Sequence, residues 1–285
     1  MKPPTDQLPF VAVVTGSSSG IGQAVALELA SRGAHVLLHA RTNLEGLMRT
    51  AKEIRQQAGD QPDHCPVRCM LADVRSVVAI DSMVRAVFAW HGYVNVWVHA
   101  AGADVLTGQA VSQSFEKKLE QLWETDLRGT LLTSRRVAQQ MLARGVPHTT
   151  LPSIVLMGWD QAEHGMEGDS GQYFCPIKAA VAAFSNSLAK SLAPHVRVNC
   201  IAPGWIQTEW GMETSDPWSS RAQREALLNR WGNPKDVARI VAAISMGDGE
   251  FVNAQTIAVN GGWCGGADHV RSRMSHEPRP FWDWR

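Results

Sequence analysis

The chain has 285 residues, of which 45% are apolar, and its formal net charge is zero because 27 basic side chains balance 27 acidic ones. This apolar fraction is typical of a packed globular core, and the balanced charge argues against nucleic acid or an anionic membrane as a partner. The amino-terminal MKPPTDQLPF has no apolar signal core and no stretch approaches 18 uninterrupted apolar residues, so we expect a cytoplasmic protein.

Short apolar runs alternate along the chain with longer stretches of helical period. This rhythm is typical of an α/β fold with a parallel sheet. The stretches GQAVALELASRG and SVVAIDSMVRAVFAWHG close on a glycine, which suits the end of a helix. No repeat or linker interrupts the pattern, so we expect one domain over residues 1–263. The seven candidate strands are residues 10–15, 35–40, 66–71, 94–100, 153–158, 195–202 and 255–259.

Two regions fall outside this rhythm. Residues 207–231 are polar and contain tryptophan, and we expect a mobile segment with a helix of its own. Residues 264–285 form a tail that we expect to be extended or docked on a neighbouring subunit, because its Phe281, Trp282 and Trp284 are poorly suited to water. A disordered end is the alternative.

The cysteines give no evidence of a disulfide framework or a metal site. The five of them are scattered and odd in number, which argues against a secreted, disulfide-bonded protein. His64, Cys65 and Cys69 lie close together in sequence but lack a second pair of ligands at zinc-like spacing. We therefore expect no metal.

A glycine-rich turn follows the first strand in VVTGSSSGIGQAVALELA. Gly16, Gly20 and Gly22 lie between this strand and a helix, where glycine lets a pyrophosphate approach the backbone and the helix N-terminus attracts it. The second strand ends in HVLLHARTN without the acid that would bind a ribose 2′-hydroxyl, and Arg41 stands where a guanidinium would meet a 2′-phosphate. We therefore expect NADP(H) in preference to NAD(H). A solvated surface arginine is the alternative.

These motifs resemble those of the short-chain dehydrogenase/reductase family. The resemblance covers residues 9–263 and includes TGSSSGIG, LADV (71–74), RVNCIAPGWIQT (197–208), RWGNPKDVARIVAAI and QTIAVNGGW. It implies a doubly wound Rossmann fold with strand order 3-2-1-4-5-6-7, assembled as a homodimer or homotetramer. The residues that it places around the cofactor are Gly16, Ser18, Gly20, Ile21, Gly22, Arg41, Asp73, Val74, Ala101, Gly102, Lys178, Pro203, Gly204, Ile206 and Thr208.

The family's Asn-Ser-Tyr-Lys catalytic tetrad is where this sequence departs. Lys178 is kept, but the tyrosine position holds Phe174, the serine position falls on Trp159 or, with a shifted loop, on Asp160, and the asparagine position holds Asp126. Phenylalanine donates no proton, and a general acid contributes about 10² to 10⁴ in rate. We predict that Lys178 still holds the nicotinamide ribose while Asp126 holds Lys178.

Other residues are candidates for the missing acid. Tyr173 lies five residues before Lys178, which is off the shared face of a helix, but Pro176 suits a first helical turn and would leave Tyr173 outside the helix and free to shift inward. The alternative is an ordinary, partly exposed tyrosine. The loop before it offers further acids, with solvated loop charge as their alternative: Asp160, Glu163, His164, Glu167 and Asp169.

The sequence favours an NADP(H)-dependent oxidoreductase that acts on a small carbonyl or alcohol, or on an activated double bond. A non-catalytic NADP(H)-binding sensor or assembly protein is the alternative. The glycine turn, Arg41 and Lys178 disfavour a scaffold that binds no cofactor. Tryptophans in residues 205–231 fit an apolar lid or ordinary packing equally well.

Overall fold

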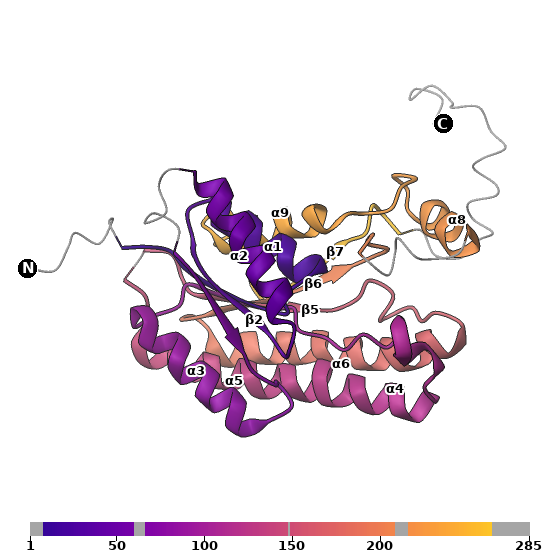
Figure 1. Ribbon diagram of the computed structural model, residues 1–285, viewed down its shortest axis with the longest axis horizontal. Coiled ribbons are helices and arrows are strands. Elements are labelled where there is room, and N and C mark those ends of the chain that lie inside the picture. Colours follow the sequence, from indigo (N-terminus) through magenta and orange to yellow (C-terminus); the bar gives the residue numbers. More distant parts are fainter. Residues whose placement is uncertain (1–7, 60–65, 148, 209–215, 264–285) are drawn as a thin grey trace, which may run out of the picture.

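Valine-rich segments form a parallel sheet at the centre of the computed structural model, which describes residues 8–59, 66–147, 149–208 and 216–263 (Figure 1). The sheet has seven strands in the order β3-β2-β1-β4-β5-β6-β7, which confirms the predicted order and fold class. The order reverses between β1 and β4, and this is where open α/β sheets form a ligand crevice at the carboxyl ends of their strands. The strands are β1 (Val11–Thr15), β2 (His35–Ala40), β3 (Val67–Leu71), β4 (Val96–His99), β5 (Ser153–Met157), β6 (Arg197–Pro203) and β7 (Thr256–Val259).

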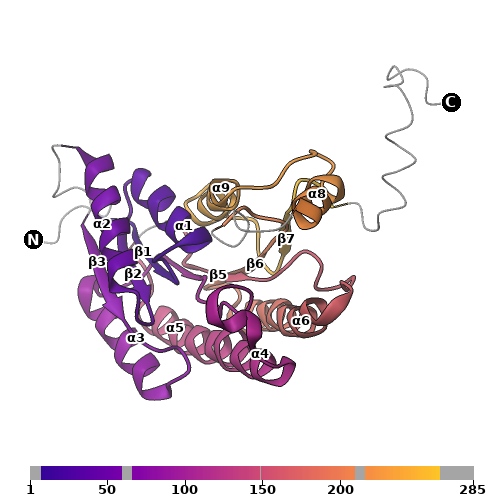
Figure 2. The same ribbon diagram turned by 45° about the vertical axis from the view of Figure 1, so that its right-hand side comes forward.

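Helices cover both faces of the sheet, as Figure 2 shows. Successive side chains of a strand point to opposite faces. Accordingly, Val11 and Val13 of β1 pack in one core with α3, α5 and α6, while Ala12 and Val14 pack in a second core with α1, α2 and α9. The helices are α1 (Gly20–Ser31), α2 (Leu44–Ala58), α3 (Val77–His91), α4 (Phe115–Leu122), α5 (Thr130–Arg144), α6 (Gly168–Leu192), α8 (Asp216–Glu225) and α9 (Pro234–Ser245).

Three local features complete the fold. A short 3₁₀ turn (Gly108–Ser112) precedes α4, and a π-helical segment (Trp123–Gly129) joins α4 to α5. Gly33 and Gly92 take positive φ values of 88° and 84° after α1 and α3, as the helix-ending glycines predicted. Among the described residues, the helices are too short or too polar to cross a bilayer.

Parts of the sequence predictions fall outside the described residues. The carboxy-terminal tail (264–285), His64 and Cys65 lie there, and so do residues 209–215 of the predicted mobile segment. The remainder of that segment does contain a helix of its own, α8.

Candidate cofactor and active site

A cavity of about 900 Å³ opens at the carboxyl ends of the strands, beside the point where the sheet order reverses. It runs from the turn after β1, past the ends of β2 and β3, to the face of α6 and the segment after β6. All of the residues predicted to contact a cofactor line it. They are Gly16, Ser18, Gly20, Ile21, Gly22, Arg41, Asp73, Val74, Ala101, Gly102, Lys178, Pro203, Gly204, Ile206 and Thr208.

The backbone of the glycine turn forms part of the cavity wall, and there is no room for a side chain at two of its glycines. A Cβ on Gly16, which has φ of +66°, would lie 2.6 Å from the carbonyl oxygen of Ala100, and a Cβ on Gly22 would lie 2.2 Å from that of Gly16. Helix α1 begins at Gly20, and its N-cap Ser19 makes no side-chain capping hydrogen bond. The first backbone N–H groups of α1 are thus available to an anion.

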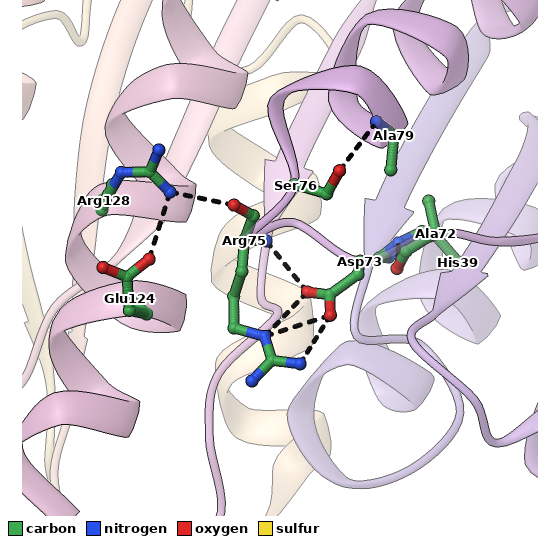
Figure 3. A network of polar contacts seen from close by, with 8 residues as sticks. All are labelled: His39, Ala72, Asp73, Arg75, Ser76, Ala79, Glu124 and Arg128. Atoms are coloured by element: carbon green, nitrogen blue, oxygen red, sulfur yellow. Dashed lines mark hydrogen bonds and ion pairs between the residues drawn. The ribbon is translucent and has the colours of Figure 1, made fainter.

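The far end of the cavity carries opposite charges. Arg41 is exposed at the end of β2 and makes no hydrogen bond or ion pair within the described part of the chain. Asp73, after β3, is paired with Arg75 (Nη2 to Oδ2, 2.6 Å), and Figure 3 shows both side chains turned toward each other. The hydrogen bonds from Arg75 lower the pKa of the Asp73 carboxyl, and the charges of Arg75 and Arg41 add to this effect.

At the opposite end, Lys178 on α6 and Asp126 on the π-helical segment form a buried ion pair. Lys178 Nζ lies 2.9 Å from Asp126 Oδ1, and the two side chains are 15% and 3% exposed. Asp126 Oδ2 also accepts a hydrogen bond from Ala103 N at 2.8 Å, while Lys178 Nζ donates to the carbonyl oxygen of Met157 at 3.3 Å. Both carboxylate oxygens are therefore used, and the predicted contact between Asp126 and Lys178 is present.

Known proteins share this fold and much of this sequence pattern. A family model described as enoyl-(acyl carrier protein) reductase matches residues 16–264. The chain is 27% identical over 254 residues to a short-chain type dehydrogenase/reductase of Picea abies, which covers 88% of this chain and 91% of that protein. It is 29% identical over 254 residues to a 3-oxoacyl-[acyl-carrier-protein] reductase, FabG, of Staphylococcus aureus, covering 88% and 96%.

The chain belongs to the short-chain dehydrogenase/reductase family.

Solved structures of the family superpose on this one. One is a single-residue variant of an actinorhodin polyketide ketoreductase with NADPH, at a TM-score of 0.76 and 28% identity, covering 91% of this chain and 98% of that one. Another is the 3-oxoacyl-[acyl-carrier protein] reductase of Brucella melitensis in complex with NAD, at a TM-score of 0.78 and 26% identity, covering 90% and 97%. The two structures thus hold different nicotinamide cofactors.

The cavity wall is apolar at Trp159 and Phe174, the residues that the sequence analysis expected at the serine and tyrosine positions of the family pattern. Trp159 and Phe174 both line the cavity, and their ring centroids lie 6.0 Å apart in an edge-to-face arrangement. Asp160, the alternative for the serine position, does not line the cavity: its Oδ2 accepts a hydrogen bond from Asn260 Nδ2 at 3.1 Å. The phenyl ring of Phe174 carries no hydrogen-bond donor, and the indole of Trp159 carries one N–H.

The predicted position of Tyr173 outside a helix is wrong. Helix α6 begins at Gly168 and contains Pro176 in its interior, so Tyr173 is helical. Its side chain is 1% exposed, belongs to the hydrophobic core and packs against Phe115 at 5.7 Å between ring centroids. The loop before the helix packs closely on its first turn, since a Cβ on Gly171 would lie 1.8 Å from the carbonyl oxygen of Met166.

Ser170 is a cavity residue that the sequence analysis missed. It lines the cavity four residues before Phe174, and its Oγ lies 3.2 Å from the hydroxyl oxygen of Tyr173. Residues 170, 174 and 178 follow each other at i, i+4 and i+8 along one face of α6. This spacing is the signal that could have identified Ser170, had the true start of the helix been known.

The other candidate acids of the loop have separate roles. Glu167 forms an ion pair with Arg221 of α8 at 2.5 Å, and His164 stacks on Trp263 at 5.0 Å between centroids. Neither lines the cavity, and nor do the exposed Glu163 and Asp169. In Asp160, by contrast, Oδ1 is buried without a hydrogen-bond partner among the described residues, and burial raises the pKa of the carboxyl to about 6.

A tryptophan closes the cavity at the side of α8. Trp205 lines it and donates its indole N–H to Glu225 Oε2 at 2.8 Å. Glu225 also accepts from Trp263 Nε1 at 3.3 Å and from Arg221 Nε at 2.7 Å. Helix α8 is thereby tied to the segments that follow β6 and β7.

Proposed function

We propose that this protein is an NADP(H)-dependent oxidoreductase that acts on a small, uncharged carbonyl or alcohol, or on an activated double bond. The observation that carries the proposal is one continuous cavity that joins the glycine turn, Arg41 and Lys178 to an apolar end formed by Trp159 and Phe174. Its volume of about 900 Å³ lies at the upper end of the range of roughly 300–1,000 Å³ that is typical of ligand pockets, so it has room for a large cofactor. Bound cofactor would supply or accept the hydride.

The preference for NADP(H) rests on Arg41. It lines the cavity at the end of β2, where an acid would favour a ribose 2′-hydroxyl and an unpaired guanidinium favours a 2′-phosphate. The cofactors named for the solved relatives support a nicotinamide cofactor in general, since one structure holds NADPH and the other NAD.

The hydroxyl of Ser170 takes over one task of the absent tyrosine in this proposal. Ser170 Oγ lies 3.2 Å from the hydroxyl oxygen of the buried Tyr173, and either hydroxyl can donate in this contact. In the proposed catalytic arrangement Tyr173 is the donor, which leaves the Ser170 proton free to form a hydrogen bond to a substrate oxygen in the cavity. Water in the cavity then supplies the proton that completes an alcohol. The apolar surroundings strengthen such a hydrogen bond as negative charge develops.

The apolar lining sets the substrate class. Met166, Phe174, Trp159 and Trp205 surround this end of the cavity, and the only cation that lines it there, among the described residues, is Lys178, already paired with Asp126. A carboxylate or phosphate on the substrate would lose its hydration without gaining a partner. We therefore infer a neutral, apolar substrate, bound by a homodimer or homotetramer of the kind expected for the family.

A second function is a cofactor-binding protein without catalysis. The specific observation in its favour is that Trp159 and Phe174 remove both hydroxyls of the family pattern from the cavity wall. Both functions require the cofactor site, but only the oxidoreductase converts a substrate.

Calorimetric titration with NADPH and with NADH tests the shared site. We expect micromolar binding with NADPH preferred, and absence of heat with both cofactors, from folded protein, would refute both functions. NADPH oxidation with a reactive aromatic dione, 9,10-phenanthrenequinone, then separates them. Turnover that falls about tenfold or more in Ser170→Ala supports the enzyme, whereas binding without turnover supports the non-catalytic protein.

A further inference from the structure

Among the described residues, the side chain that holds the carboxylate of Asp73 is that of Arg75. Arg75 Nε donates to Asp73 Oδ1 and Oδ2 at 3.0 Å each, its Nη2 donates to Oδ2 at 2.6 Å, and its backbone N donates to Oδ1 at 2.9 Å. Figure 3 shows the guanidinium nitrogens facing both carboxylate oxygens. Both oxygens of Asp73 are thus occupied by a charge-assisted, fork-like contact.

The backbone of Arg75 is itself fixed. Arg128, from the π-helical segment, donates from Nη1 to the carbonyl oxygen of Arg75 at 2.9 Å, and Glu124 Oε2 holds the same Nη1 at 3.1 Å. The next residue, Ser76, caps α3 by accepting a hydrogen bond from Ala79 N. Arg75 therefore reaches Asp73 from an anchored turn (Figure 3).

Arg41 is the second cation at this end of the cavity, and it has no such partner. It is exposed, lines the cavity together with Asp73, and makes no hydrogen bond or ion pair within the described part of the chain. It follows the end of β2, which pairs with the end of β3 through Ala40 and Leu71, so Arg41 and Asp73 leave neighbouring strand ends. The charge of Arg41 also lowers the pKa of the Asp73 carboxyl. If Asp73 lost Arg75, its free carboxylate would attract the exposed guanidinium of Arg41.

We propose that Arg75 determines cofactor specificity by occupying the Asp73 carboxylate, so that Arg41 stays free to bind the 2′-phosphate of NADP(H). This inference rests on the proposed cofactor site. The charges of Arg41, Arg75 and Asp73 sum to +1, whereas without Arg75 the two that remain sum to zero and can pair with each other. Arg75 acts through Asp73 and Arg41, and is a positioning residue that needs no contact with the cofactor.

Calorimetric titration of the full-length protein and its variants with NADPH and NADH tests this proposal. Arg75→Ala is expected to weaken NADPH binding about tenfold and to change NADH binding less than about twofold. Adding Asp73→Asn to that variant removes the competing carboxylate, so the double variant should recover the ratio of NADPH to NADH affinity. A merely structural role of Arg75 predicts no such recovery.

Arg85→Ala is the matched control, because it removes an equal charge from the exposed face of α3, where the one hydrogen bond of the Arg85 side chain to described residues goes to Ser82. It should leave both affinities unchanged. Two results would overturn the proposal but leave the cofactor site standing. In the first, Arg75→Ala weakens the binding of NADPH and of NADH equally. In the second, the double variant binds NADPH as weakly as Arg75→Ala does. No binding of either cofactor by the unaltered protein would overturn the cofactor site and this inference together.

Discussion

Replacing Asp126 with asparagine tests the buried ion pair at the catalytic end of the cavity. Asp126 Oδ1 holds Lys178 Nζ at 2.9 Å and its Oδ2 holds Ala103 N at 2.8 Å. An asparagine keeps only one acceptor oxygen. If that oxygen faces Lys178, the amide NH₂ faces the N–H of Ala103, and if it faces Ala103, the NH₂ faces an ammonium.

The expected loss of stability is large because the pair is buried: the side chains of Lys178 and Asp126 are 15% and 3% exposed. Removing one partner of a buried pair costs about 3–5 kcal/mol. Asparagine retains part of the hydrogen bonding, so we expect the free energy of unfolding to fall by about 2–4 kcal/mol and the melting temperature by roughly 3–7 °C. Because Lys178 also loses its orienting partner, NADPH affinity should fall about twofold to tenfold, the value of one hydrogen bond.

Urea unfolding and NADPH titration measure both effects. Asp81→Asn provides the matched control, because Asp81 pairs with Arg136 with its side chain 40% exposed, and an exposed pair contributes about 0–1 kcal/mol. An Asp126→Asn protein as stable as the Asp81→Asn protein, with unchanged NADPH affinity, would show that Asp126 does not hold Lys178 as the structure indicates.

Further predictions concern the cavity wall and the pH dependence of stability. Phe174→Tyr places a phenol in the cavity and should raise carbonyl reduction at least ~10²-fold in steady-state assays if the parent is nearly inactive; a small gain over an active parent would mean that the proton comes from elsewhere. Burial lowers the pKa of His99 to about 3, so the unfolded chain takes up a proton near pH 6.5 that the folded protein does not bind, and stability falls as the pH drops. His99→Asn should remove about 2 kcal/mol of the difference in unfolding free energy between pH 7 and pH 5, and an unaltered difference would contradict this reasoning. Burial raises the pKa of Asp160 to about 6, so the stability that its protonated carboxyl contributes is fully present below about pH 4 and is lost as the pH rises through 6. Asp160→Asn should therefore be more stable than the parent at pH 8 by up to about 3 kcal/mol but not at pH 4, and equal stability at pH 8 would refute the assignment.

Local sequence determined the sheet and the turn. The apolar runs predicted every strand to within two residues at each end, because a strand buried on both faces is apolar at successive positions. The glycine turn was also predictable from local sequence, because the strand before it and the helix after it both have short-range sequence signals. The helical period also placed Phe174 and Lys178 on one face, and that face lines the cavity.

Only the tertiary structure decided which side chains are buried and what they contact. Pro176 was expected in the first turn of α6, yet the helix starts at Gly168, because packing of Tyr173 into the core and of the preceding loop on Gly171 outweighs the lost backbone hydrogen bond. Ser170 joined the cavity face as a result. The burial of Asp160 likewise depends on Asn260, 100 residues further along the chain. Propensity and period act over a few residues, whereas burial and pKa depend on neighbours that only folding brings together.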